Sequence, residues 1–304
     1  MINDEMIAIP DFFIVGAPKC GTTAMFEYLG KHPDIYIPKY KETHHFASDL
    51  IPMDDHFRSV DNYLKIFQGA QKGDVIGDAS VFYLYSKEAA HNINRFNDRA
   101  KIIIMIRDPV DMLESYHSQL VFNGDEDIED LKKALDAEGE RKKGNLIPKG
   151  LRFKERLFYY DISCFSDQIN RYFDVFGKER VHVIIYDEFK EQTEMVYART
   201  LEFLEVDPAF RTEFEIINPC KRVRSRLIRE FLLRPPKLVR MISRSILFPV
   251  REAIYRKLME YNSQFVTRQP MDPDLRRYLR EKFRPEIERL GILLKRNFEG
   301  WMID

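Results

Sequence analysis

Residues 16–23 read GAPKCGTT, directly after the apolar run FFIV and directly before AMFEYL. A glycine-rich turn between a strand and a helix is typical of a phosphate site, because backbone N–H groups and the helix N-terminus converge on the anion. The ATP-binding loop G-x-x-x-x-G-K-[ST] carries its lysine after the second glycine. Here Thr22 stands at that place, and Lys19 lies inside the loop. The stretch therefore predicts a phosphate loop of another kind.

Several residues of this loop suit an anion. Gly16 and Gly21 permit turns that a Cβ would obstruct. Thr22 and Thr23 can donate hydroxyl hydrogen bonds at the helix start. Lys19 offers a point charge where a leaving oxygen would develop negative charge.

Apolar runs alternate with helical patterns along the rest of the chain. Continuous apolar strands separated by helices indicate an α/β fold with a parallel sheet covered on both faces, and ligands of such sheets lie at the carboxyl ends of the strands. The expected strands are 11–16, 74–80, 101–109 and 180–189, and the expected helices are 22–32, 110–122 and 191–206. The polar stretch 123–150 is expected to form a helix and a mobile loop or lid.

Composition limits the class of protein. The 304 residues carry a net charge of −1, so no whole-molecule field favours nucleic acid, and an anion site must be local. Three scattered cysteines indicate neither a zinc site nor a disulfide framework. The N-terminal residues lack the pattern of a signal peptide, and no uninterrupted apolar run approaches the roughly 18 residues of a membrane span. We therefore expect a cytoplasmic protein.

The loop resembles the 5′-phosphosulfate loop of sulfotransferases that use 3′-phosphoadenosine 5′-phosphosulfate (PAPS). In that family a lysine lies two residues before the glycine of a G-T or G-T-T, as Lys19 does here. The resemblance implies a P-loop-like three-layer fold, PAPS as sulfuryl donor, 3′-phosphoadenosine 5′-phosphate (PAP) as product, and no metal requirement. It implies that the donor's 5′ end is bound by the loop residues Pro18, Lys19, Cys20, Gly21, Thr22 and Thr23.

A second anion site is expected at IIIMIRDPVDMLESYHS. It places Arg107 at the end of a strand and Ser115 eight positions later on the next helix. An arginine can grip two phosphate oxygens and a serine hydroxyl a third. The pair matches the family's second signature, which implies that Arg107 and Ser115 hold the 3′-phosphate.

The segment KETHHF (41–46) resembles the K-E-x-H-F-F of the heparan-sulfate-type and related bacterial branch. The resemblance implies that Glu42 is the catalytic base and that Lys41 assists it electrostatically. His44 or His45 is the alternative base, because another branch of the family uses histidine, and a solvated charge run is the structural alternative. GDASVFYLYS (77–86) loosely resembles a segment that lines the acceptor side, so Tyr83, with Glu42 and His45, is expected to contact the acceptor.

The C-terminal residues resemble the end of the same branch, and Arg268 maps to a loop that folds over the nucleotide. Residues 221–257 contain twelve Lys or Arg against two Glu. This segment is expected either to contact a peripheral membrane surface, an acidic polymer or a carrier, or to be a solvated helical face. We expect one domain over 1–304, with a core at 10–210, a basic helical segment at 211–260, and a cofactor-covering loop with helices at 261–304.

The sequence thus predicts sulfuryl transfer from PAPS to an acceptor hydroxyl, less favourably an amine, by in-line displacement. The acceptor classes left open are sugars, lipids, carrier-bound natural products and small phenols. A P-loop nucleotide kinase and a catalytically silent nucleotide-binding protein are the alternatives. No feature of the sequence indicates an oligomeric state.

Overall fold

Five parallel strands form the central sheet of the computed structural model, in the order β2-β3-β1-β4-β5. The structure describes residues 8–52, 55–215, 221–223, 225, 257–258, 261–265 and 271–303. The strands of this sheet are β1 (Phe12–Gly16), β2 (Ile35–Tyr36), β3 (Val75–Ala79), β4 (Lys101–Ile106) and β5 (Val181–Ile185).

The central strands are apolar on both faces. All five residues of β1 are buried, and in β4 only Lys101 is partly exposed. Such continuous burial requires helices on both sides of a parallel sheet, as the sequence predicted. Strand β2 was not predicted, because its two residues carry too little pattern.

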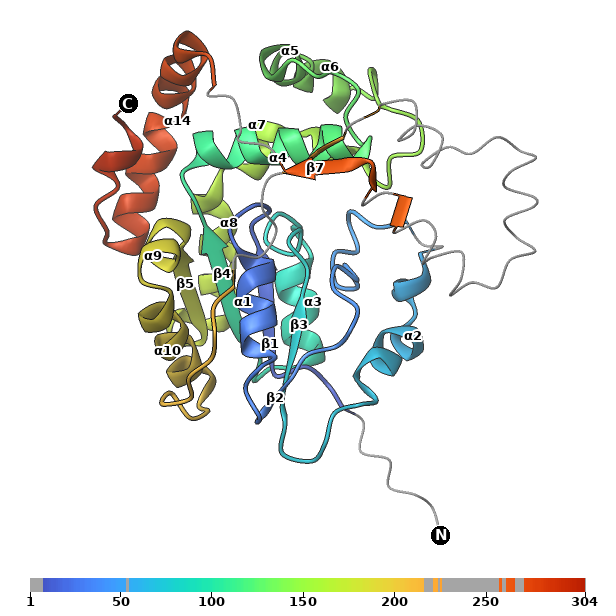
Figure 1. Ribbon diagram of the computed structural model, residues 1–304, viewed down its shortest axis with the longest axis vertical. Coiled ribbons are helices and arrows are strands. Elements are labelled where there is room, and N and C mark those ends of the chain that lie inside the picture. The colour runs from blue at the N-terminus through green and yellow to red at the C-terminus, as the bar shows by residue number, and fades with distance from the viewer. Residues whose placement is uncertain are drawn as a thin grey trace, which may run out of the picture.

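Helices cover the sheet in two groups (Figure 1). Helix α1 (Thr22–Leu29) packs on β1 and β3 and against α10 (Thr193–Leu204). Helix α3 (Ala89–Phe96) packs against α8 (Phe165–Phe176), which lies on β4 and β5. The result is the three-layer α/β architecture expected from the sequence.

The region after β5 differs from the prediction. A strand was expected over 180–189, but β5 ends at Ile185 and helix α9 (Tyr186–Glu191) begins directly after it. Asp187 and Glu188 lie in the first turn of α9, where carboxylates favour a helix start. The apolar run alone did not reveal this change of conformation.

The predicted helix at 110–122 is α4 (Pro109–Asn123). Pro109 occupies its first turn, and the Asp108 side chain accepts hydrogen bonds from the Val110 and Asp111 amides at 2.9 and 3.4 Å. These features start the helix two residues after Arg107, which directly follows β4.

The predicted helix within 123–150 is present as two short ones, α5 (Leu131–Asp136) and α6 (Glu138–Lys142). A fully buried ion pair anchors them, because Arg141 donates two hydrogen bonds to Glu126 at 2.6 and 2.7 Å. The Tyr159 hydroxyl donates a third to the same carboxylate at 2.6 Å.

The C-terminal residues form helix α14 (Pro273–Leu294), which packs against α4 and α8 (Figure 1). Leu279 and Phe283 of this helix are buried. The remaining elements are α2 (Val60–Leu64), α7 (Tyr159–Ile162), the antiparallel pair β6 (Lys221–Val223) and β7 (Ser263–Phe265), and the 3₁₀ turns His56–Arg58, Lys65–Phe67, Lys154–Leu157, Lys178–Arg180 and Glu299–Trp301. Within the described ranges, no helix has the length and apolar content that a bilayer crossing needs.

Candidate active site

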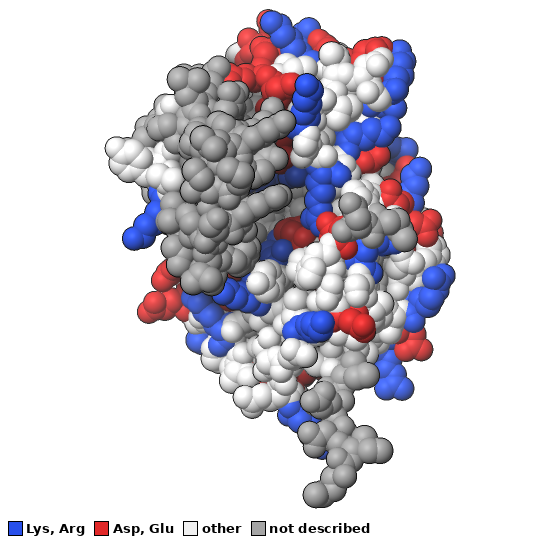
Figure 2. Space-filling view, turned by 90° about the vertical axis from the view of Figure 1, so that its right-hand side faces the viewer, with Lys and Arg blue, Asp and Glu red and all other residues white. Residues whose placement is uncertain are grey.

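A cleft of about 700 Å³ lies at the carboxyl ends of the central strands. It gathers nine of the predicted site residues from three separate parts of the chain: Pro18, Lys19, Gly21, Thr22, Thr23, Lys41, Glu42, Arg107 and Ser115. Lys and Arg side chains border a hollow on the face drawn in Figure 2. The chain thus concentrates positive charge locally although its net charge is −1.

The loop between β1 and α1 has the backbone of an anion cradle. Lys19 and Gly21 have φ angles of 62° and 85°, in the left-handed region. A Cβ on Gly21 would lie 3.0 Å from Cδ2 of Tyr186, so both the conformation and the space favour glycine. The Lys19 ammonium donates a hydrogen bond to Oε1 of Gln119 at 3.1 Å, which directs it toward α4.

Arg107 extends from the end of β4 into the same cleft. Its guanidinium lies 4.8 Å from the ring centroid of Tyr186, in cation–π contact, and its Nη2 lies 3.5 Å from Oδ2 of Asp111. Its buried Nε has no hydrogen-bond partner among the described residues. Ser115, two turns along α4, is nearly buried and lines the cleft as well. Together they form a second site with donors suited to an oxyanion.

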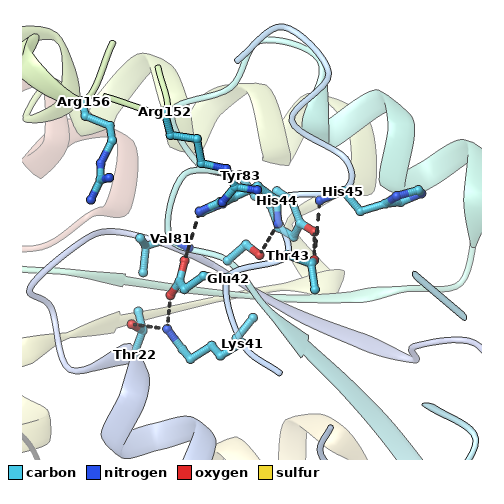
Figure 3. Close-up of polar contacts among 12 residues, drawn as sticks. Thr22, Lys41, Glu42, Thr43, His44, His45, Val81, Tyr83, Arg152 and Arg156 are labelled. Atoms are coloured by element: carbon cyan, nitrogen blue, oxygen red, sulfur yellow. Dashed lines mark hydrogen bonds and ion pairs between the residues drawn. The ribbon is translucent and has the colours of Figure 1, made fainter. Parts of the chain in front are cut away.

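Lys41 and Glu42 connect the loop with the opposite wall of the cleft (Figure 3). The Lys41 ammonium is hydrogen-bonded to Oε1 of Glu42 and lies 3.5 Å from Oγ1 of Thr22. The Val81 amide donates to Oε2 of Glu42 at 2.9 Å. Burial by itself raises the pKa of the Glu42 carboxyl, but the Lys41 ammonium and the Val81 amide hold it below its ordinary value. Glu42 is therefore ionised at neutral pH.

His44, one of the two alternative bases, lies next to this carboxylate. Its Nε2 is 3.6 Å from Oε2 of Glu42, and burial lowers the pKa of His44 to about 4. The imidazole is therefore neutral at pH 7. Glu42 and His44 have φ angles of 66° and 54°, which non-glycine residues adopt at a cost of about 1 kcal/mol or more each. The fold holds both side chains in place against that cost.

Three predicted residues do not line the cleft. Cys20 is fully buried, with its Sγ 3.4 Å from the carbonyl oxygen of Pro18. The His45 ring stacks on Tyr63 at a centroid distance of 4.2 Å, and its Nδ1 lies 2.5 Å from the Phe57 carbonyl oxygen.

The third, Tyr83, is fully buried and donates to Oδ2 of Asp78 at 3.0 Å. Its hydroxyl also lies 3.2 Å from Oγ1 of Thr43, so Tyr83 braces the segment that carries Glu42. A further predicted residue, Arg268, and most of the basic segment 221–257 lie outside the described residues.

Several cleft residues were not anticipated from the sequence. The most informative is Tyr186, whose ring supports both Arg107 and the turn at Gly21. Its position directly after a buried strand was the available signal, but the strand was expected to continue. Others include Tyr28, Gln119, Arg156, Phe189 and Phe214. In the described part of the chain, no group of three or more His, Cys, Asp or Glu side chains is arranged to hold a metal ion.

The sequence model of the family described as "Sulfotransferase domain" matches residues 9–225. This range contains the whole central sheet, the phosphate loop, Glu42, Arg107 and Ser115. The predicted resemblance to sulfotransferases is thereby confirmed.

Similarity to individual proteins agrees with this match. Membrane-associated sulfotransferase kil1 of Dictyostelium discoideum is 30% identical over 120 residues, covering 38% of this chain and 24% of that protein. Carbohydrate sulfotransferase 15 of Mus musculus is 28% identical over 148 residues, covering 35% and 26%. The chain thus matches about a quarter of the length of these curated relatives. The crystal structure of a sulfotransferase from Alicyclobacillus acidocaldarius is similar over 98% of this chain and 100% of that chain, with 29% identity and a TM-score of 0.74.

Proposed function

Because the chain belongs to the sulfotransferase domain family, we propose that it moves a sulfuryl group from PAPS to an acceptor hydroxyl. One observation carries the proposal: a single cleft gathers two separate sets of side chains suited to anions, together with an ionised carboxylate. The first anion site includes Lys19, the second includes Arg107, and the carboxylate is that of Glu42.

The two anion sites fit the two phosphates of the donor. The loop with Lys19, Thr22 and Thr23 is suited to the 5′ end, and Arg107 with Ser115 to the 3′-phosphate. The buried Nε of Arg107, without a partner among the described residues, is an unused donor that a phosphate oxygen would satisfy. When bound, PAPS supplies the sulfuryl group and a phosphate as leaving group.

Glu42 has the position of a general base. Since its carboxylate is ionised at neutral pH, it can hold the proton of an acceptor hydroxyl as that oxygen attacks sulfur. A carboxylate with a lowered pKa is a weak base, so we expect proton transfer late in the reaction. Lys41 keeps Glu42 in place. His44, unlike Glu42, is not among the residues that line the cleft, so we assign it the role of a neighbour of Glu42 rather than that of the base.

Lys19 is assigned to the leaving oxygen. Its ammonium belongs to the phosphate loop, and the hydrogen bond to Gln119 restricts its position. A fixed cation stabilises the charge that develops on a leaving phosphate oxygen without further reorganisation. This role explains why the lysine stands inside the loop.

For the acceptor, we favour a carbohydrate hydroxyl. Carbohydrate sulfotransferase 15 of Mus musculus is named for that class of acceptor. Lipid and natural-product hydroxyls are the alternatives. Cytoplasmic localisation, the single-domain organisation over 1–304 and membrane contact through 221–257 stay predictions.

Calorimetric titration of the wild type and Arg107→Ala with PAP, and with ATP plus Mg²⁺, tests the donor. We expect binding of PAP that Arg107→Ala loses and that ATP does not match. Tighter binding of ATP with Mg²⁺ would overturn the proposal in favour of a kinase. Binding of PAP without sulfation of any hydroxyl in a panel of sugars, lipids and phenols supplied with labelled PAPS would favour a silent binding protein.

A further inference from the structure

Helix α14 brings two arginines to the two aspartates that flank the predicted 3′-phosphate site. Arg276 donates two hydrogen bonds to Oδ1 of Asp111, at 3.0 and 3.1 Å. One turn further along α14, the nearly buried Arg280 pairs with Asp108. Asp111 is the same carboxylate whose other oxygen, Oδ2, lies 3.5 Å from Arg107. The sequence did not reveal this contact, because Asp111 and Arg276 are separated by 165 positions.

The second support of Arg107 is tied to the same C-terminal region. Arg280 also donates to the backbone carbonyl of Trp301, and the Trp301 indole N–H donates to Oδ2 of Asp187 at 3.2 Å. Asp187 follows Tyr186, the residue on whose ring the Arg107 guanidinium stacks. Both contacts of Arg107 therefore rest on residues that the C-terminal helix and its following turn hold in place.

The carboxylate of Asp111 is unfavourable next to an anion site. An ionised carboxylate beside Arg107 competes with a phosphate for the same N–H donors and repels its charge. The two hydrogen bonds from Arg276 offset the charge of this carboxylate and engage its Oδ1. The contact left between Asp111 and Arg107 is long, at 3.5 Å. Such a contact orients the guanidinium and leaves N–H donors of Arg107 available to a phosphate.

We infer that Arg276 is a positioning residue of the 3′-phosphate site, which acts by withholding Asp111 from Arg107. This inference rests on the proposed function, because it takes the Arg107–Ser115 site to bind the 3′-phosphate. It makes α14 a part of donor recognition although Arg276 does not line the cleft.

The test compares two nucleotides that differ only in the 3′-phosphate, PAP and adenosine 5′-phosphate, by calorimetry on the full chain. In Arg276→Gln, Asp111 is free to pair closely with Arg107. We expect PAP to bind about tenfold more weakly, the scale of one charge-assisted hydrogen bond, and adenosine 5′-phosphate to bind unchanged. Unchanged binding of adenosine 5′-phosphate also shows that the variant is folded.

Two further variants separate positioning from structural support. The double variant Arg276→Gln with Asp111→Asn removes the competing charge, so we expect it to regain the wild-type preference for PAP. Arg277→Gln is the matched control, because Arg277 is the next residue on α14, is exposed, and pairs with the exposed Asp274 at 3.1 Å. We expect it to bind both nucleotides as the wild type does.

The outcomes are distinguishable. A wild type that binds PAP and adenosine 5′-phosphate equally would overturn the proposed function and this inference together. A wild type that prefers PAP, with Arg276→Gln keeping the same preference, would overturn the inference alone. A double variant that binds PAP as weakly as Arg276→Gln does would also overturn the inference. Removing the charge of Asp111 does not restore affinity for PAP that was lost through a purely structural effect.

Discussion

The Lys41 ammonium is hydrogen-bonded to the carboxylate of Glu42, the next residue in the chain. The same ammonium lies 3.5 Å from Oγ1 of Thr22 in the phosphate loop. A single cation therefore joins the proposed base to the proposed donor site. Its charge is one of the influences that keep the pKa of Glu42 low although burial raises it.

Lys41→Met is predicted to move the acid limb of the pH–rate profile to higher pH. Glu42 acts in its ionised form, so the rate rises with pH as the carboxyl loses its proton. In the wild type this midpoint lies below the ordinary pKa of 4.5. Burial raises the pKa of Glu42 and the Lys41 ammonium lowers it, so removal of the ammonium raises this pKa. The measurement is kcat against pH with an acceptor that screening shows the enzyme to sulfate.

Lys39→Met is the matched control, because Lys39 is exposed and lies two residues away. It is expected to keep the wild-type profile. An acid limb that stays in place in Lys41→Met would show that Lys41 does not control the ionisation of Glu42.

Glu42→Gln is predicted to lower kcat by about 10²–10⁴-fold, the usual contribution of a positioned general base. The amide keeps the size of the side chain but cannot take a proton. We expect PAP binding to change little, because Glu42 contacts neither predicted phosphate site directly. Glu27→Gln, on the exposed face of α1, serves as the control. A kcat within about threefold of the wild type would exclude Glu42 as the base.

Asp78 is predicted to make stability fall as pH rises from 4 to 6. Burial raises its pKa to about 6, although Tyr63 and Tyr83 donate hydrogen bonds to it at 3.0 Å. The folded state therefore binds a proton that the unfolded state releases near its ordinary pKa of 3.8, and this stabilisation is lost through pH 6. The loss amounts to about 3 kcal/mol, at about 1.4 kcal/mol for each pKa unit.

Urea unfolding at pH 4, 5, 6 and 7 tests this for the wild type and Asp78→Asn. The difference in unfolding free energy between them should shift in favour of Asp78→Asn as pH rises, because the amide does not titrate. A difference that is constant across this range would contradict the prediction.

Arg141→Met is predicted to cost about 3–5 kcal/mol of stability, because it leaves the Glu126 carboxylate charged and buried without its partner. Adding Glu126→Leu should recover part of this loss, since the unpaired charge is then gone. Lys132→Met is the control: it breaks the exposed pair with Asp136, which is worth under about 1 kcal/mol. Urea unfolding measures all three variants. A loss below about 1 kcal/mol in Arg141→Met would show that this pair does not anchor α5 and α6.

The parts of the site that sequence reasoning located depend on neighbours in the chain. The phosphate loop follows β1 and precedes α1, so its backbone N–H groups must converge at the end of the sheet. Arg107 directly follows β4 and Ser115 lies on the next helix, and parallel strands bring their carboxyl ends to one edge. The family resemblance supplied Glu42 and Lys41, and the cleft contains both.

Other features depended on contacts between distant residues. Nothing local distinguishes His44 from His45, yet the first lies beside Glu42 and the second stacks on Tyr63. The aromatic support from Tyr186 was hidden because the apolar run of β5 did not reveal that the strand ends at Ile185.

The sequence by itself determined the strand–loop–helix units and the local order of donors along them, because hydrophobic periodicity and turn residues act over a few positions. Tertiary structure alone decided which histidine approaches Glu42, and that Arg276 reaches Asp111 across 165 residues. Such pairings depend on how helices pack over the sheet. That packing is set by the shape and burial of many side chains at once, which no short stretch of sequence contains.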